Sequence, residues 1–199
     1  DFAPFQPWLE RIVELRKQYI ECFAPYDDPY DVLLEDYEPG MRTSEIRDVF
    51  AVLASELPAL VAEQATDEED AFMDGPFPIA AQDTLSRELV EAFGATWDQF
   101  RLDPTVHPFE VTFGLGDIRL TTRYAENELT SLFTAMHETG HGIYEWGVSK
   151  TLERTPLAAG VSATLHESQS RLWENVVGRS LPFWRWFYPR VQRTFPAEL

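Results

Sequence analysis

The segment His137-Glu138-Thr139-Gly140-His141 constrains the fold of this chain more than any other feature of the sequence. Residues 132–136 before it are almost all apolar, and further apolar and aromatic side chains follow within residues 143–146. This pattern predicts a helix that is mostly buried. In such a helix, His137 and His141 lie on one face because they are four residues apart. Buried polar side chains are costly without partners. The fold must therefore give partners to two imidazoles and one carboxylate.

Two imidazoles at this spacing on a helix can share one metal ion. Imidazole nitrogen suits Zn²⁺, which proteins normally hold with four ligands, although Co²⁺ or Mn²⁺ can occupy similar sites. Glu138 would lie beside such a metal rather than on it. There its carboxylate could take a proton from metal-bound water and later deliver it to a leaving amine. The alternative interpretation is two solvent-facing histidines on an ordinary helix, which the apolar flanks disfavour.

A catalytic zinc site needs a third protein ligand and one open position. A third histidine at the short spacing that some metallopeptidases use is absent, since that position is Gly147. Glu145 would place three ligands in a row on one helix, and Glu153 falls in a predicted loop. Glu167 lies early on a later predicted helix, which would support it rigidly if the two helices pack together. The candidate third ligands are Glu145, Glu153, Glu167 and Glu174.

Hydrophobic periodicity predicts a mostly helical chain, which we interpret as a single domain over residues 1–199. A loop with a short turn at residues 30–36 is expected within residues 24–42, where Pro and Gly are frequent. Residues 66–74 are acidic and predict a solvated loop. The predicted helices span residues 4–22, 43–63, 79–93, 126–146, 160–178 and 182–194.

One stretch has a different character. Residues 109–114 and 117–124 are β-prone, and Gly114-Leu115-Gly116 between them is a turn signal. This pattern predicts a β-hairpin. The expected fold class is therefore mainly α, with one small antiparallel β-sheet.

Composition excludes several classes of partner. The chain has 34 acidic and 16 basic residues and a formal net charge of -18, which repels nucleic acid and anionic membranes. No apolar run approaches the roughly 20 residues needed to cross a bilayer. Cys22 is the single cysteine, so no disulfide can form within the chain. With no leader segment visible, these features predict a cytoplasmic protein. Because the chain begins with Asp1, we expect it to come from a longer or processed product.

Three further motifs point to a known family. His166-Glu167-Ser168-Gln169 resembles the H-E-S-Q signature of the carboxypeptidase Taq family of metal-dependent carboxypeptidases. His107-Pro108-Phe109 resembles its H-P-F motif, and the segment from Asp117 to Thr121 resembles its D-x-R-x-T motif. Together with H-E-x-x-H, the motifs follow the order of the family and use all four histidines of the chain.

The resemblance implies a fold and a reaction. The expected fold is that of the neurolysin-like, mainly helical metallopeptidases, with an active-site groove and a small sheet on its wall. The expected reaction removes single residues from the C-terminus of peptides, with broad side-chain tolerance. By the resemblance, His137, His141 and Glu167 would be metal ligands, and Glu138 the general base and acid. The family also suggests a homodimer of the full-length parent.

Two residues of the groove wall have alternative interpretations. His107 and Arg119 would lie near the substrate if the resemblance holds in detail. Otherwise His107 is a hairpin residue bonded to backbone, and Arg119 forms an ion pair with Asp117 or a neighbouring carboxylate.

The third motif supplies two possible supporting residues. For His166 we favour a supporting role over direct metal ligation: it would orient a metal ligand or lie near the oxyanion that forms during hydrolysis. The alternative is that His166 only packs against its neighbours. Arg171 is four residues after Glu167 and could hold that carboxylate in place.

The chain also departs from the family. Two family signatures, of the forms I/V-R-x-x-A-D and G-x-x-Q-D-x-H-W, are not found after Arg171. In the family those segments carry the basic group expected to grip the C-terminal carboxylate of the substrate. The chain is thus interpreted as a central catalytic segment, and our hypothesis is that it binds metal yet is weak or inactive alone. We also expect an exposed apolar surface that includes Phe183, Trp184, Trp186 and Phe187.

Two other functions stay open from the sequence. One is another peptidase with the same H-E-x-x-H and Glu site, acting as an endopeptidase or an aminopeptidase. The other is a non-catalytic module that binds metal or a protein partner. The chemistry of the site alone does not separate the first of these from a carboxypeptidase, whereas a Glu138→Gln variant of the non-catalytic module would show no functional change.

Overall fold

The computed structural model describes residues 2–64 and 75–195. The chain divides into two compact units, Asp1–Asp67 and Glu68–Leu199. The single domain expected from the sequence stays a prediction. The predicted acidic loop at residues 66–74 lies outside the described residues. None of the described helices is both long enough and apolar enough to cross a membrane.

The described part of the first unit contains three helices: α1 (Gln6–Glu21), α2 (Pro29–Glu35) and α3 (Thr43–Gln64). The short turn expected at residues 30–36 is a complete helix, because Asp28 caps it by accepting a hydrogen bond from the backbone N–H of Tyr30. Asp31 is buried and accepts hydrogen bonds from the backbone N–H and the hydroxyl of Thr43, at 2.7 and 2.6 Å. One carboxylate therefore ties α2 to the start of α3.

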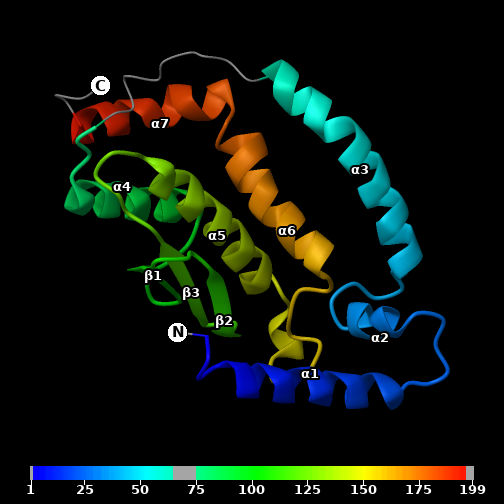
Figure 1. Cartoon of the computed structure of the whole chain (residues 1–199). Coiled ribbons are helices and arrows are strands. Elements are labelled where there is room, and N and C mark those ends of the chain that lie inside the picture. Colours follow the sequence, from blue (N-terminus) through cyan, green and yellow to red (C-terminus); the bar gives the residue numbers. More distant parts are fainter. Residues whose placement is uncertain (1, 65–74, 196–199) are drawn as a thin grey trace. The chain divides into compact units, whose positions relative to one another are not determined.

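The second unit contains the other helices and all three strands of the described part (Figure 1). The helix predicted over residues 160–178 is α6 (Ala163–Arg171), which continues as a π-helical segment, η3 (Leu172–Val177), capped by Gly178. The elements are α4 (Ile79–Ala92), β1 (Phe100–Pro104), β2 (Glu110–Gly114), β3 (Asp117–Thr122), α5 (Thr130–Trp146), η2 (Lys150–Leu152), α6 (Ala163–Arg171), η3 (Leu172–Val177) and α7 (Leu181–Thr194).

The sheet has three strands in the order β1-β3-β2. The predicted hairpin is confirmed, since β2 and β3 pair antiparallel. The expectation of a purely antiparallel sheet is wrong, because β1 adds to β3 in parallel, with Leu102 opposite Leu120. Only Phe100 and Leu102 of β1 are buried, so the alternation of apolar and polar residues that would indicate a strand is too short to recognise in the sequence. Its pairing comes from a strand further along the chain, which no local pattern reveals.

Helix α5 lies between the sheet on one side and α6 on the other (Figure 1). Two glycines allow this close packing. A Cβ on Gly142 would lie 2.9 Å from side-chain atoms of Ile118 and Leu120 on β3. A Cβ on Gly140 would lie 2.7 Å from backbone atoms of Gln169 and Ser170 on α6. Both glycines flank or belong to the H-E-x-x-H segment, so the segment is fixed by contacts on two sides.

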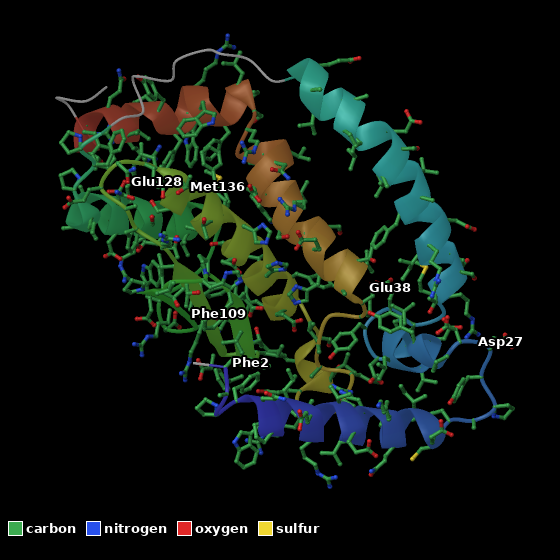
Figure 2. All side chains as sticks on the ribbon, in the orientation of Figure 1. Phe2, Asp27, Glu38, Phe109, Glu128 and Met136 are labelled. Carbon is green, nitrogen blue, oxygen red and sulfur yellow. The ribbon has the colours of Figure 1, made fainter. Side chains whose placement is uncertain are left out.

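The core of the second unit is formed by side chains of α4, the sheet, α5 and α7 (Figure 2). Met136, which directly precedes the histidine motif, is fully buried in it. The largest fully buried apolar side chains are Phe77, Leu85, Leu89, Leu102, Ile118, Leu120, Leu132, Met136, Phe187 and Phe195.

The aromatic residues of α7 differ from the expectation. Phe183 and Phe187 are buried, and their rings stack with centroids 5.4 Å apart. Trp184 packs partly buried against the core. Trp186 is the exposed member of these four aromatic side chains, with 47% of its surface exposed. The prediction is wrong for Phe183 and Phe187 because α7 turns one aromatic face towards α4 and the core.

Candidate metal centre

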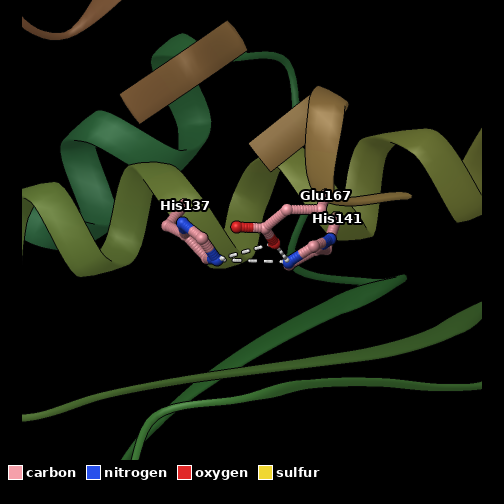
Figure 3. A group of neighbouring side chains, drawn as sticks. All are labelled: His137, His141 and Glu167. Carbon is pink, nitrogen blue, oxygen red and sulfur yellow. Dashed lines mark hydrogen bonds and ion pairs between the residues drawn. The ribbon is translucent and has the colours of Figure 1, made fainter. Parts of the chain in front are cut away.

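Three side chains from two helices converge in the second unit (Figure 3). His137 and His141 come from one face of α5, and their Nε2 atoms are 3.2 Å apart. Glu167 comes from α6, and its Oε2 lies 3.6 Å from His137 Nε2 and 3.5 Å from His141 Nε2. We call this group the triad. It brings together the two histidines of the motif and one of the four candidate third ligands.

The spacing of the triad atoms suits a divalent metal. A tetrahedral zinc ion with bonds of about 2.0–2.1 Å separates its ligand atoms by about 3.3–3.4 Å. The observed separations of 3.2, 3.5 and 3.6 Å each come within a few tenths of an ångström of this value. Two imidazole nitrogens and one carboxylate oxygen are also a donor set that zinc uses in catalytic sites. The residues present therefore fit a bound metal.

Both imidazoles are held from behind. Nδ1 of His137 lies 2.9 Å from Oε2 of Glu174. Nδ1 of His141 contacts Nδ1 of His166, whose Nε2 lies 2.9 Å from Oε1 of Glu145. These contacts leave the Nε2 atom of each motif histidine directed to the triad. Such outer partners fix the orientation of metal-binding rings.

The environment of His141 keeps it neutral. Burial, together with the neighbouring His166 and His137, lowers the pKa of His141 to about 4. A neutral imidazole is the form that binds metal. His166 behaves in the opposite way, because its hydrogen bond to Glu145 raises the pKa of the ring.

Glu167 is anchored by two donors. Nε of Arg171 donates to Glu167 Oε1 at 2.7 Å, and the hydroxyl of Ser170 donates to Oε2 at 3.1 Å. Burial by itself would raise the pKa of Glu167, but the hydrogen bonds from Arg171 and Ser170 outweigh it and lower the pKa. The carboxylate is therefore ionised at neutral pH, as a metal ligand must be.

Glu138 lies beside the triad on the buried side of α5, with 6% of its surface exposed. Burial raises its pKa to about 7, and the negative charges of Glu110 and Glu167 add to the effect. A carboxyl group with a pKa near neutrality can both accept and release a proton. A divalent cation at the triad would lower this pKa by its own charge.

An open groove with a volume of about 920 Å³ runs past this site. His137 and Glu138 open into it, and His107 and Arg179 lie on its wall. Its full lining is His107, Pro108, Asn127, Glu128, Leu129, Thr130, Phe133, Thr134, His137, Glu138, Arg171, Glu174 and Arg179. A side chain that can exchange protons thus faces a space large enough for part of a peptide.

With this geometry established, comparison with known proteins identifies the family. The family model described as "Carboxypeptidase Taq (M32) metallopeptidase" matches residues 1–199. This chain belongs to the carboxypeptidase Taq (M32) family. The family resemblance drawn from the sequence motifs is thereby confirmed.

Relatives of the M32 family match the whole chain. "Thermostable carboxypeptidase 1" of Thermus thermophilus is 42% identical over 210 residues, which cover 99% of this chain and 41% of the relative. "Carboxypeptidase 1" of Bacillus subtilis is 37% identical, over 100% of this chain and 40% of the relative. The crystal structure of the M32 carboxypeptidase from Deinococcus radiodurans R1 has a TM-score of 0.86 at 37% identity, over 100% of this chain and 41% of that chain. This chain thus spans about two fifths of the length of its relatives.

The remaining M32 motif residues fall in different places. His107 lies on the wall of the groove beside the triad, and its contact with substrate stays a prediction. Arg119 forms the ion pair considered as its alternative, donating to both oxygens of Asp117 at 2.9 Å, with its guanidinium over the ring of Phe113. Arg119 is not among the described residues that line the groove.

The other candidate ligands have different partners. Glu145 accepts hydrogen bonds from the backbone N–H of Gly160 and from His166. Glu153 follows the short helix η2 and lies outside the triad. Glu174 lies behind His137, a position that sequence reasoning missed. The available signal was its spacing, since Glu174 follows Glu167 by two helical turns and so shares its face.

Proposed function

We propose that this chain is the metal-holding part of a zinc-dependent carboxypeptidase, which releases single C-terminal residues from peptides with broad specificity. The triad carries this proposal, because its three ligand atoms have the spacing of a zinc site and lie beside a buried glutamate. Membership of the M32 family and the names of its relatives support the carboxypeptidase reaction.

The proposed mechanism assigns separate tasks to the residues of the groove. His137, His141 and Glu167 would hold the metal, which when bound would act as a Lewis acid on the peptide carbonyl and on water. Glu138 would take a proton from the attacking water and pass it to the nitrogen of the leaving residue. Its burial and its pKa of about 7 support that role.

The groove wall would position the peptide. His107 lines the same groove as Glu138 and would donate a hydrogen bond to a substrate carbonyl. Arg171 would support Glu167 rather than touch substrate, because its Nε is already bonded to that carboxylate. We further propose that His166 supports His141, and we assign no substrate contact to Arg119, whose charge is paired with Asp117.

Several broader features belong to the same proposal. The neurolysin-like fold, with the groove as active site, and the homodimer of the full-length parent rest on the family resemblance. The single cysteine, Cys22, is free and exposed, which is consistent with a cytoplasmic protein. We also propose that the chain by itself is a weak or inactive peptidase, since it spans about 41% of the relative from T. thermophilus.

The first experiment measures bound metal and then hydrolysis. Wild-type chain and the His137→Ala variant are purified under identical conditions, and their metal content is measured by elemental analysis. We expect about one Zn²⁺ per wild-type chain, and loss of the metal from the variant. Equal metal content in both proteins, or none in either, would contradict the proposed site.

Hydrolysis is assayed with three matched peptides: one with a free C-terminus, one with an amidated C-terminus, and one with a blocked N-terminus and a free C-terminus. A carboxypeptidase releases single residues from the first and third peptides only. Cleavage of the amidated peptide would indicate an endopeptidase or aminopeptidase with the same metal site. Glu138→Gln is the matched control, because it keeps the triad and removes the proposed base.

A further inference from the structure

The carboxylate of Glu174 meets His137 on the ring nitrogen that faces away from the triad. Its Oε2 lies 2.9 Å from His137 Nδ1, whereas Oε2 of Glu167 approaches the other ring nitrogen, Nε2. The side chain of Glu174 is only 13% exposed. Each ring nitrogen of His137 therefore faces a carboxylate: Nδ1 faces Glu174, and Nε2 faces Glu167.

This contact selects the state of the His137 ring. An ionised carboxylate can accept a hydrogen bond but cannot donate one. The proton of a neutral His137 must then be on Nδ1, where Glu174 accepts it. The lone pair of Nε2 is left free and directed at the triad, which is the arrangement that a metal ligand requires.

Glu174 is itself held in place by two guanidinium groups. Nη1 of Arg171 donates to Glu174 Oε2 at 3.2 Å, and Nη2 of Arg179 donates to Oε1 at 3.1 Å. Hydrogen bonds between ionised groups are stronger than neutral ones. Glu174 therefore has little freedom to leave His137, and its negative charge is stabilised.

The backbone explains how both carboxylates reach one ring. Glu167 is on α6, and Glu174 is in the π-helical segment η3 that continues it. The contacts of His137 with Glu174 and of Gly140 with Ser170 show that α5 and this segment run antiparallel. Glu167 thus lies at the triad, and Glu174 lies further along, behind His137. Single π-helical turns occur often at functional sites.

We propose that Glu174 is a positioning residue, which fixes the ring orientation and the Nδ1–H tautomer of His137 for metal binding. This inference rests on the proposed metal site. Glu174 does not ligate the metal, since it bonds the far nitrogen of the ring. It acts through His137.

The test is the Glu174→Gln variant, which keeps the shape of the side chain and replaces one acceptor oxygen by an NH₂ donor. The new amide can donate to Nδ1 and so stabilise the tautomer with its proton on Nε2, where it blocks the metal. We expect the affinity for Zn²⁺, measured by competition with a chromogenic chelator, to fall by about 10- to 100-fold.

Two controls and a second variant separate positioning from general structural effects. Glu88→Gln makes the same chemical change at an exposed residue of α4 and is expected to leave zinc affinity unchanged. Arg179→Gln removes one ion pair of Glu174 without touching His137, and is expected to lose less affinity than Glu174→Gln. Glu174→Ala removes the acceptor without adding a donor, and serves as the second variant if Glu174→Gln does not fold.

A second readout needs no metal. The chain has four histidines, so the ring nitrogens of the metal-free protein can be assigned by ¹⁵N NMR. We expect the Nδ1–H tautomer for His137 in the wild type and a shift towards the Nε2–H tautomer in Glu174→Gln. A role in folding alone would change the melting temperature without changing the tautomer.

The outcomes distinguish this inference from the proposed function. Zinc binding by the wild type with equal affinity and tautomer in Glu174→Gln would overturn the role of Glu174 and leave the metal site intact. Equal losses in Arg179→Gln and Glu174→Gln would also overturn it, because the ion-pair network would then be responsible. Failure of the wild type to bind zinc would overturn both.

Discussion

Replacement of Gly140 by alanine tests whether the close contact of α5 with α6 assembles the triad. The added Cβ would lie 2.7 Å from the carbonyl oxygen of Gln169 and 2.7 Å from Cα of Ser170, where ordinary contacts begin at 3.4 Å. Both atoms belong to the backbone and cannot rotate away. The two helices must therefore separate locally by several tenths of an ångström or more.

Two opposing effects determine the change in stability. Alanine favours the helix over glycine by about 1 kcal/mol. Overpacking of this kind costs about 1–3 kcal/mol, and the upper part of that range applies because the obstructing atoms are backbone. We expect a net loss of about 1–2 kcal/mol in the free energy of unfolding of the second unit.

The effect on metal binding should be larger than the effect on stability. Glu167 lies two residues before Gln169 on α6, so a displacement of α6 carries its carboxylate away from His137 and His141. The distances of 3.5 and 3.6 Å between Glu167 Oε2 and the histidine nitrogens are already slightly longer than the edge of a zinc tetrahedron, about 3.3–3.4 Å, and they would increase further. We expect zinc affinity to fall by at least about tenfold, in line with other losses of ligand placement.

The assay compares Gly140→Ala with Gly116→Ala, in which the added Cβ has no heavy atom within 4 Å. Zinc affinity is measured by chelator competition, and stability by urea unfolding of the metal-free chains. Wild-type zinc affinity in Gly140→Ala would refute the reasoning, because it would show that the triad does not depend on the close approach of the two helices.

Three further predictions concern the proposed general base, a buried aromatic ring and a buried carboxylate. Glu138→Gln should bind Zn²⁺ as the wild type does and lose any peptide hydrolysis by about 10²–10⁴-fold, as judged by elemental analysis and a release assay; a variant with full activity would exclude Glu138 as the base. Phe187→Ala should lower the free energy of unfolding, measured with urea, by about 3–5 kcal/mol, because Phe187 is fully buried. A loss no larger than that caused by substituting an exposed residue would show that α7 is loosely packed. The hydroxyl and backbone N–H of Thr43 lower the pKa of Asp31, against the effect of burial and with help from Arg42. The Asp31 carboxylate therefore stabilises the folded state above its unfolded pKa of about 3.9, and this stabilisation is lost as the pH falls through the lower pKa of the folded state. Circular dichroism should show that Asp31→Asn weakens the first unit at neutral pH and removes this acid dependence.

Local pattern was sufficient to predict the centre of the site. His137 and His141 are four residues apart on a helix, so their common face follows from helix geometry alone. Glu167 was one of four candidates by spacing, and the family resemblance selected it. The hairpin of β2 and β3 was also predictable, since its turn and both strands are adjacent in sequence.

Features that depend on distant contacts were not predictable from the sequence. Strand β1 has a short pattern of its own and exists by pairing with β3. The burial of Phe187 depends on the packing of α7 against the rest of the second unit. The position of Glu174 depends on the antiparallel packing of α5 with α6 and η3, and on the π-helical turn itself.

The glycines of α5 also bear on the order of folding. Gly140 and Gly142 lie inside a helix of 17 residues, and each interior glycine disfavours an isolated helix by about 1 kcal/mol. The histidine segment should therefore have little helical structure until β3 and α6 dock against it. The triad is complete only when α6 brings Glu167 to the two histidines. Metal capture by all three ligands would therefore report that α6 has packed against α5.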